Sequence, residues 1–245
     1  MQEMLYPVAV VFMGYTVLGI TGFGSALLIV PLLAWHWPLA EVVTLTLLLD
    51  LPASLLLGGM NRRYIHWQEL KRLLPGVLLG AVLGLWLTQQ LASRWPLVAL
   101  GVYVVVVGLR TLRVTEVRTQ TLVQPWSLAA GGVIGLVEML FGTSGPLIVA
   151  WLTRRLPDVM VLRASTSAAI TVSTCVVLLT MAVAGRLSQP ELGWRWLTLI
   201  PLAIAGVLVG QRWAERVSSK GLRQAIALLL VISGGALMHH ALSTS

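Results

Sequence analysis

The sequence predicts an all-α polytopic membrane protein. Of its 245 residues, 57% are hydrophobic and only 11% are charged, whereas soluble domains carry roughly 25% charged residues. The mean hydropathy is +0.87, and the apolar residues form several stretches, most of them near the ~20 residues that cross a bilayer as a helix. This composition excludes a soluble globular domain.

The charged residues indicate how the chain is anchored. The net charge of +8 comes from 17 Lys and Arg residues against 9 Asp and Glu residues. Most of the basic residues lie in short loops, as they do at the cytoplasmic face of membrane proteins, so we expect no nucleic-acid partner. The loops are too short for a soluble domain, and the sequence holds no Walker A loop, dinucleotide fingerprint or metal-ligand cluster. We therefore expect a protein that is not an enzyme, with no cofactor, metal site or catalytic residue.

Eight apolar stretches follow one another along the chain. Most of the Trp residues lie at their ends, as in the aromatic belts of membrane interfaces. Most of the stretches have the length of one membrane-crossing helix, but the first and the fifth contain glycine-rich runs. The stretches cover about residues 4–35, 39–60, 73–92, 95–112, 126–152, 162–185, 196–214 and 222–242.

The first and fifth stretches each predict a broken helix. Residues 4–35 are too long for one crossing and contain the run Thr-Gly-Phe-Gly-Ser at 21–25, and residues 126–152 contain the run Gly-Thr-Ser-Gly-Pro at 142–146. Clustered glycines interrupt helices, and a broken helix at membrane depth is tolerated only where protein or a water-filled cavity satisfies its backbone groups.

The positions of the basic residues predict that these two broken helices are hairpins. If all eight stretches crossed the membrane, the Lys and Arg residues would divide 8 to 9 between the two faces. If the first and fifth stretches dip in and return, 14 lie on one face and 3 on the other, which satisfies the positive-inside rule. We expect two glycine-centred hairpins with arms of about 13–16 residues and both chain termini on the periplasmic, extracytoplasmic side.

The two halves of the chain resemble each other. Five identities recur at an offset of 126 residues, and Phe23-Gly24 matches Phe141-Gly142 at an offset of 118. Each half holds one hairpin and three crossings, and an odd number of crossings inserts the second copy upside down. The sequence therefore predicts two inverted-topology repeats, residues 1–114 and 126–245, joined by a loop at 115–125. The five pairs are Pro75 and Pro201, Gly80 and Gly206, Gly84 and Gly210, Ser93 and Ser219, and Gly108 and Gly234.

The helix starts at the two breaks predict an anion-binding site. A helix N-terminus presents free N–H groups and about half a positive charge, and broken helices in corresponding positions of two halves point to a substrate site. The alternative is that the glycines only permit tight turns. The candidate substrate-binding residues are Thr21, Gly22, Phe23, Gly24, Ser25, Phe141, Gly142, Thr143, Ser144, Gly145 and Pro146.

Two acidic residues lie inside apolar stretches. Asp50 follows three leucines, and Glu138 precedes Gly142 by four residues. Ionisable groups at this depth are costly and usually line a cavity, so both are candidates for proton coupling. Alternatively, each is a neutral carboxyl group bonded to a neighbouring helix. The hydroxyl-rich residues 163–174 likewise suit either a polar pathway or hydrogen bonds between helices.

The run Gly22-Phe23-Gly24-Ser25, the run 141–146 and the paired prolines and glycines resemble the TauE/SafE sulfite exporter family over nearly the whole chain. The resemblance implies a bacterial inner-membrane permease, a secondary transporter of sulfite, organosulfonates or other small sulfur-containing anions. Its partners would be the anion and the lipid bilayer, and glycine-striped helix faces also favour a homodimer.

Two other functions compete with a transporter that couples anions to protons. A passive anion channel would share the polar path but lack coupling. The run Gly142-Thr143-Ser144-Gly145 also matches the G-x-S-G of rhomboid-like intramembrane serine proteases, with His239 or His240 as the base. Against the protease, both histidines lie next to the C-terminus.

Overall fold

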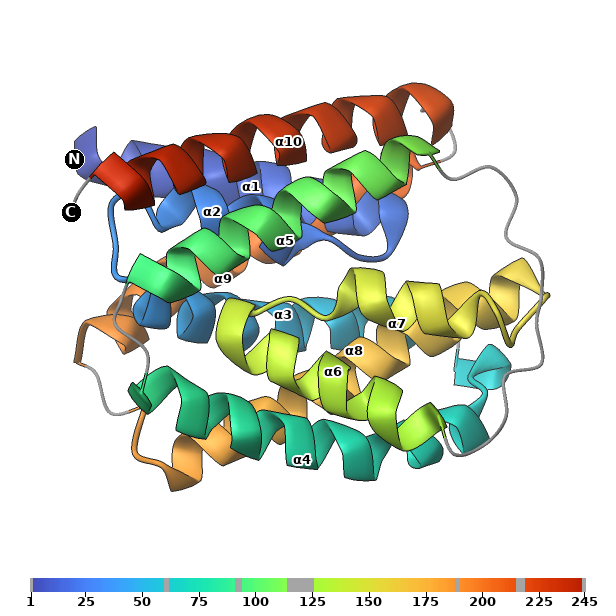
Figure 1. Ribbon diagram of the computed structural model, residues 1–245. Coiled ribbons are helices and arrows are strands. Elements are labelled where there is room, and N and C mark those ends of the chain that lie inside the picture. The colour runs from blue at the N-terminus through green and yellow to red at the C-terminus, as the bar shows by residue number, and fades with distance from the viewer. Residues whose placement is uncertain are drawn as a thin grey trace.

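The computed structural model is helical throughout the residues that it describes (Figure 1). These residues form ten α-helices and one 3₁₀ turn and contain no strand. The predicted connecting loop at 115–125 lies outside them. The described ranges are 2–59, 62–90, 94–113, 126–187, 190–214 and 219–243. The elements are α1 (Gln2–Thr21), α2 (Ser25–Leu33), α3 (Leu39–Gly59), η1 (Arg62–Tyr64), α4 (Trp67–Gln90), α5 (Arg94–Arg113), α6 (Trp126–Phe141), α7 (Gly145–Leu152), α8 (Val159–Val183), α9 (Pro190–Trp213) and α10 (Ser219–Ser243).

Both predicted helix breaks are present, but their arms are unequal. The first break separates α1 from α2, and the second separates α6 from α7. The predicted arm length of 13–16 residues holds for α6, with 16 residues, but is wrong for α1, with 20, and for α2 and α7, with only 9 and 8. The reason is that the glycine run lies late in each stretch. At 1.5 Å per residue the short arms span about 12–14 Å.

The first broken helix is a hairpin. The hydroxyl of Tyr6, near the start of α1, donates to the carbonyl oxygen of Leu32, near the end of α2, at 2.9 Å. The Tyr6 ring also lies edge-on to the ring of His36, with centroids 4.9 Å apart. These contacts show that α2 turns back along α1 towards the end of the molecule where α1 begins.

Several helices have the length and composition of membrane spans. Shorter apolar segments lie in α1, α5, α6 and α10, and the predicted crossings at 95–112 and 222–242 coincide with α5 and α10. This arrangement is that of a polytopic membrane protein. Four helices of the described residues are long and apolar enough to cross a bilayer: Leu39–Gly58, Trp67–Gln90, Met160–Val183 and Glu191–Trp213.

The closest helix pairs join the first half of the chain to the second. α4 packs along α6, and α9 packs along α1, while α5 pairs with α10 and α3 with α8 (Figure 1). The start of α1 and the end of α10 lie at the same end of the bundle (Figure 1).

Glycines bring two of these pairs into backbone contact. A Cβ atom on Gly80 of α4 would stand 2.0 Å from the carbonyl oxygen of Gly132 in α6. A Cβ atom on Gly210 of α9 would stand 2.2 Å from the carbonyl oxygen of Thr16 in α1. The glycine stripes therefore face inward, and a homodimer would have to use another surface.

Ion pairs also join the two halves of the chain. One lies near the end of α3 and the start of α8, and the other lies near the start of α3 and the end of α8. Nη1 of Arg155 donates to both carboxylate oxygens of Glu69 at 3.0 Å. At the opposite end, Nη1 of Arg195 donates to Oε2 of Glu41 at 2.6 Å. Each guanidinium group also lies over a Trp ring, at 4.5 and 4.3 Å from the ring centroid, a favourable cation–π arrangement.

Candidate functional site

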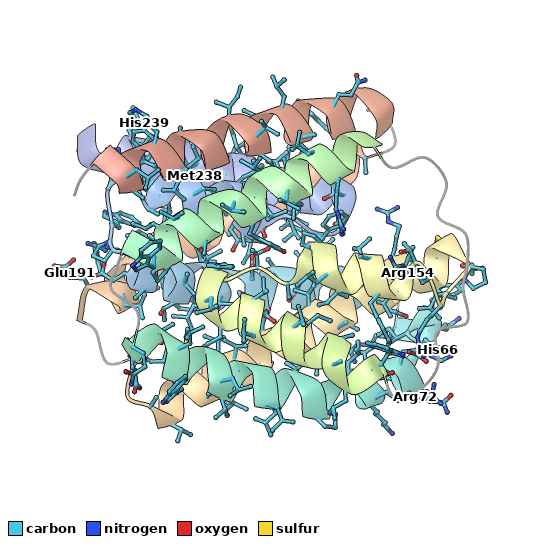
Figure 2. The ribbon with its side chains drawn as sticks, viewed as in Figure 1. His66, Arg72, Arg154, Glu191, Met238 and His239 are labelled. Carbon is cyan, nitrogen blue, oxygen red and sulfur yellow. The ribbon has the colours of Figure 1, made fainter. Side chains whose placement is uncertain are left out.

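A small cavity lies where the two helix breaks meet, and side-chain oxygen atoms gather at the centre of the bundle (Figure 2). The cavity has room for about one water molecule, so in this conformation it is too small for a polyatomic ligand. A separate cavity beside α4 has an almost wholly aliphatic lining. The central cavity is lined by Leu18, Gly24, Ser25, Ala26, Asp50, Ser54, Glu138, Gly142, Thr143, Ser144, Gly145 and Ile170.

The helix starts at this cavity have no side-chain caps. The N-cap of α2 is Gly24, with a φ of 99°, and the N-cap of α7 is Ser144; neither makes a side-chain capping hydrogen bond. A Cβ atom on Gly24 would meet no atom within 4 Å, so the backbone borders open space there. The N–H groups and dipoles of both helix starts favour negative charge at this position.

The turns at the two helix breaks contact each other at the cavity. A Cβ atom on Gly145 would stand 3.1 Å from Cβ of Phe23 and 3.7 Å from the backbone nitrogen of Gly24. Gly145 therefore allows the turn between α6 and α7 to approach the turn between α1 and α2, and a ligand in the cavity would contact both turns.

The backbone turns at the two breaks are alike at an offset of 120 residues. The N–H of Gly22 donates to the carbonyl oxygen of Leu18, and the N–H of Gly142 donates to that of Glu138, both at 2.7 Å. Both glycines have positive φ, 84° and 67°. The offset of 118 inferred from the Phe-Gly match is therefore wrong for the turn itself, since that match pairs Gly142 with Gly24 and not with Gly22.

Asp50 connects α3 to both arms of the first hairpin. Its Oδ1 accepts hydrogen bonds from the hydroxyls of Tyr15 in α1 and Ser25 in α2, each at 2.8 Å. All three residues are buried. Asp50 thus lines the cavity and also bonds to two neighbouring helices.

Glu138 has one bonded oxygen and one without a partner. Its Oε1 accepts a hydrogen bond from Thr174 of α8 at 2.7 Å. Its Oε2 is buried and has no hydrogen-bond partner among the described residues, and the residue is only 1% exposed. The hydroxyls of Ser144 and Ser173 lie beside this carboxyl group and 3.4 Å from each other.

Six of the eleven predicted binding residues line the cavity and five do not. The Thr21 hydroxyl donates to the carbonyl oxygen of Val17 in its own helix at 2.8 Å, and the Phe141 ring stacks on Tyr103 with centroids 5.8 Å apart. These residues shape the turns and their packing. The five residues outside the cavity lining are Thr21, Gly22, Phe23, Phe141 and Pro146.

Several site residues were not predicted from the sequence. Ser54 lies one helical turn after Asp50, and that i,i+4 spacing could have identified it. Leu18, Ala26 and Ile170 line the cavity but look like any other core residue in the sequence. Thr174 belongs to the hydroxyl-rich run, and its bond to Glu138 joins two helices at the cavity.

The described residues do not assemble a serine protease. The polar neighbours of the Ser144 hydroxyl are Ser173 and Glu138. His239 is exposed near the end of α10 (Figure 2), and the side chain of His240 lies outside the described residues.

Comparison with known proteins identifies the family. The family described as sulfite exporter TauE/SafE matches residues 7–237. The chain belongs to the TauE/SafE family. One similar protein is the probable inner membrane transporter protein TsaS of Comamonas testosteroni, 40% identical over 197 residues, which are 80% of this chain and 82% of that protein. No solved structure matches the chain significantly. Family and relative both point to a membrane transporter, which is consistent with a protein that is not an enzyme.

Proposed function

We propose that the protein is a secondary transporter of small sulfur-containing anions such as sulfite or organosulfonates. The observation that carries the proposal is that two uncapped helix starts and the hydroxyl-bearing residues Thr143 and Ser144 meet at one small cavity. Such a site binds an oxyanion through backbone N–H groups and hydroxyls without a cation that would hold it too tightly. The family and its relative support the transport function.

Two inverted repeats, residues 1–114 and 126–245, are part of this proposal. The 120-residue register of the two turns and the reciprocal pairing of α4 with α6 and of α9 with α1 support it. In this arrangement the two helix starts approach the anion from opposite sides of the membrane. Rocking of one half against the other would then expose the cavity alternately.

The proposed location is the bacterial inner membrane, with both termini in the periplasm. The 14 to 3 division of basic residues supports this orientation. The position of the start of α1 and the end of α10 at one end of the bundle agrees with it (Figure 1).

Proton coupling through Asp50 or Glu138 completes the proposal. Both carboxyl groups are buried at the cavity wall, where a proton on a carboxyl group would offset the charge of the anion. A passive channel is the second candidate, but a cavity with room for about one water molecule favours a closed intermediate of a transport cycle over a continuous pore.

Anion flux into proteoliposomes tests the proposed function. We expect saturable flux of one or more of sulfite, sulfoacetate, taurine, thiosulfate and sulfate, and uphill accumulation under a pH gradient. Ser144→Ala removes one hydroxyl from the site, and loss of a hydrogen bond to a charged group costs about 1.5–3 kcal/mol. That loss corresponds to roughly 10- to 100-fold weaker half-saturation.

Ser233→Ala is the matched control. Ser233 is a buried serine whose hydroxyl bonds only within α10, to the carbonyl oxygen of Leu230 at 3.3 Å. Flux through this variant should equal that of the wild type. If no sulfur anion moves, the substrate assignment is wrong; if anions move only downhill and their flux does not saturate, the protein is a channel.

A further inference from the structure

We propose that Glu138 alone carries the proton that is coupled to anion transport, that its protonated Oε2 donates a hydrogen bond to the bound anion, and that Asp50 instead positions the first hairpin. The inference rests on the proposed function, which lets either carboxyl group carry the proton, and it gives the two groups different roles. It comes from the different surroundings of the two carboxyl groups.

Asp50 already has the partners of a carboxylate. Two hydroxyl donors, from Tyr15 and Ser25, point at its Oδ1, and hydrogen bonds donated to the charged form favour that form. One of these donors is the first residue of α2. Protonation would weaken the contacts that hold α2, and with it the helix start, at the cavity. A charged Asp50 therefore keeps the first half of the anion site in place.

Glu138 lacks a partner where a transported proton would sit. A buried carboxylate oxygen without a donor is costly. Although the hydroxyls of Ser144 and Ser173 lie beside the carboxyl group, Oε2 makes no hydrogen bond among the described residues. Once protonated, Oε2 becomes a donor, and an anion oxygen in the cavity would satisfy it. Proton and anion thus stabilise each other's binding, which is the requirement for moving both together. With a monovalent anion the loaded site gains no net charge.

The other ionisable groups around Glu138 are compatible with this role. Three ionisable groups interact electrostatically with it: Asp50 on α3, Tyr103 on α5 and Cys175 on α8. α7 contains no ionisable side chain, and α4 contains none between residues 73 and 90. No cation of the described residues is among the groups that act on Glu138, so a proton on Glu138 would be what offsets the charge of the anion.

The two carboxyl groups are not repeated between the halves of the chain. In the 120-residue register, Glu138 corresponds to Leu18, and Asp50 corresponds to Ile170, since α3 and α8 also begin 120 residues apart. Both aliphatic residues line the same cavity. Each half thus supplies one carboxyl group from a different element, and the two groups are free to have different roles.

Sulfite accumulation in proteoliposomes under an inward-directed proton gradient tests the division of roles. Glu138→Gln keeps a permanent hydrogen-bond donor at the site, so sulfite exchange should remain measurable at a lower rate. Uphill accumulation should be lost, so that the ratio of internal to external sulfite falls to the value that passive equilibration gives. Asp50→Asn should lower the exchange rate by about tenfold but keep accumulation under the gradient. Accumulation by Glu138→Gln, or its loss in Asp50→Asn alone, would overturn the inference.

Infrared spectroscopy of the full-length protein in liposomes gives a second readout that needs no transport. A protonated carboxyl band should appear as the pH falls, grow when sulfite is added, vanish in Glu138→Gln and persist in Asp50→Asn. If the wild type moves no sulfite but shows this band, the proposed function fails and the proton site stands. A wild type without a band that depends on Glu138 contradicts the proton site itself.

Discussion

Replacing Gly80 by alanine is expected to lower the stability of the protein by about 3 kcal/mol or more, the upper end of the usual cost of overpacking. The added Cβ atom would stand 2.0 Å from the carbonyl oxygen of Gly132 and 2.7 Å from the backbone nitrogen of Leu136. Both are backbone atoms of α6, so no side chain can turn away. Only separation of α4 from α6 relieves the clash, and thermal unfolding in detergent measures its cost.

Gly235→Ala is the matched control for this prediction. Gly235 lies within α10, and a Cβ atom there would meet nothing within 4 Å. Alanine also favours a helix over glycine by roughly 1 kcal/mol, so the unfolding temperature of this variant should stay the same or rise. A Gly80→Ala protein as stable as Gly235→Ala would show that α4 and α6 do not pack this closely in the membrane.

The glycine and charge patterns predict much of the fold because both have direct physical causes. Clustered glycines break helices, and α1 and α6 end immediately before Gly22 and Gly142. The positive-inside rule treats the first broken stretch as a hairpin, and the contact from Tyr6 to Leu32 shows that hairpin in the structure. These features depend on local sequence or on simple counts, which a single chain provides.

The parts that the sequence did not predict depend on contacts between distant segments. The pairing of α4 with α6 and of α9 with α1 is one such part, because the composition of a stretch does not show which other stretch it packs against. The same holds for Asp50 and Glu138: both are acidic residues in apolar stretches, yet Asp50 meets two donors, whereas Oε2 of Glu138 meets none among the described residues. Only the positions of neighbouring helices distinguish them.

The prediction most specific to the binding site compares Gly24→Ala with Gly185→Ala. Both glycines have positive φ, 99° and 71°, and an added Cβ atom would meet nothing within 4 Å at either. Alanine in left-handed backbone costs about 1–2 kcal/mol, so the two variants should lose similar stability in thermal unfolding. They differ in place, because Gly24 lines the cavity and Gly185 lies in the turn after α8.

Sulfite flux should therefore separate the two variants. A methyl group on Gly24 would occupy a cavity with room for about one water molecule and would lie at the start of α2, where we propose that the anion contacts the backbone. We expect flux through Gly24→Ala to fall by about tenfold or more, a loss of roughly 1.4 kcal/mol or more, while Gly185→Ala keeps the wild-type rate per folded molecule. Equal losses in both variants would assign the effect to backbone strain, and normal flux through Gly24→Ala would place the anion away from the paired helix starts.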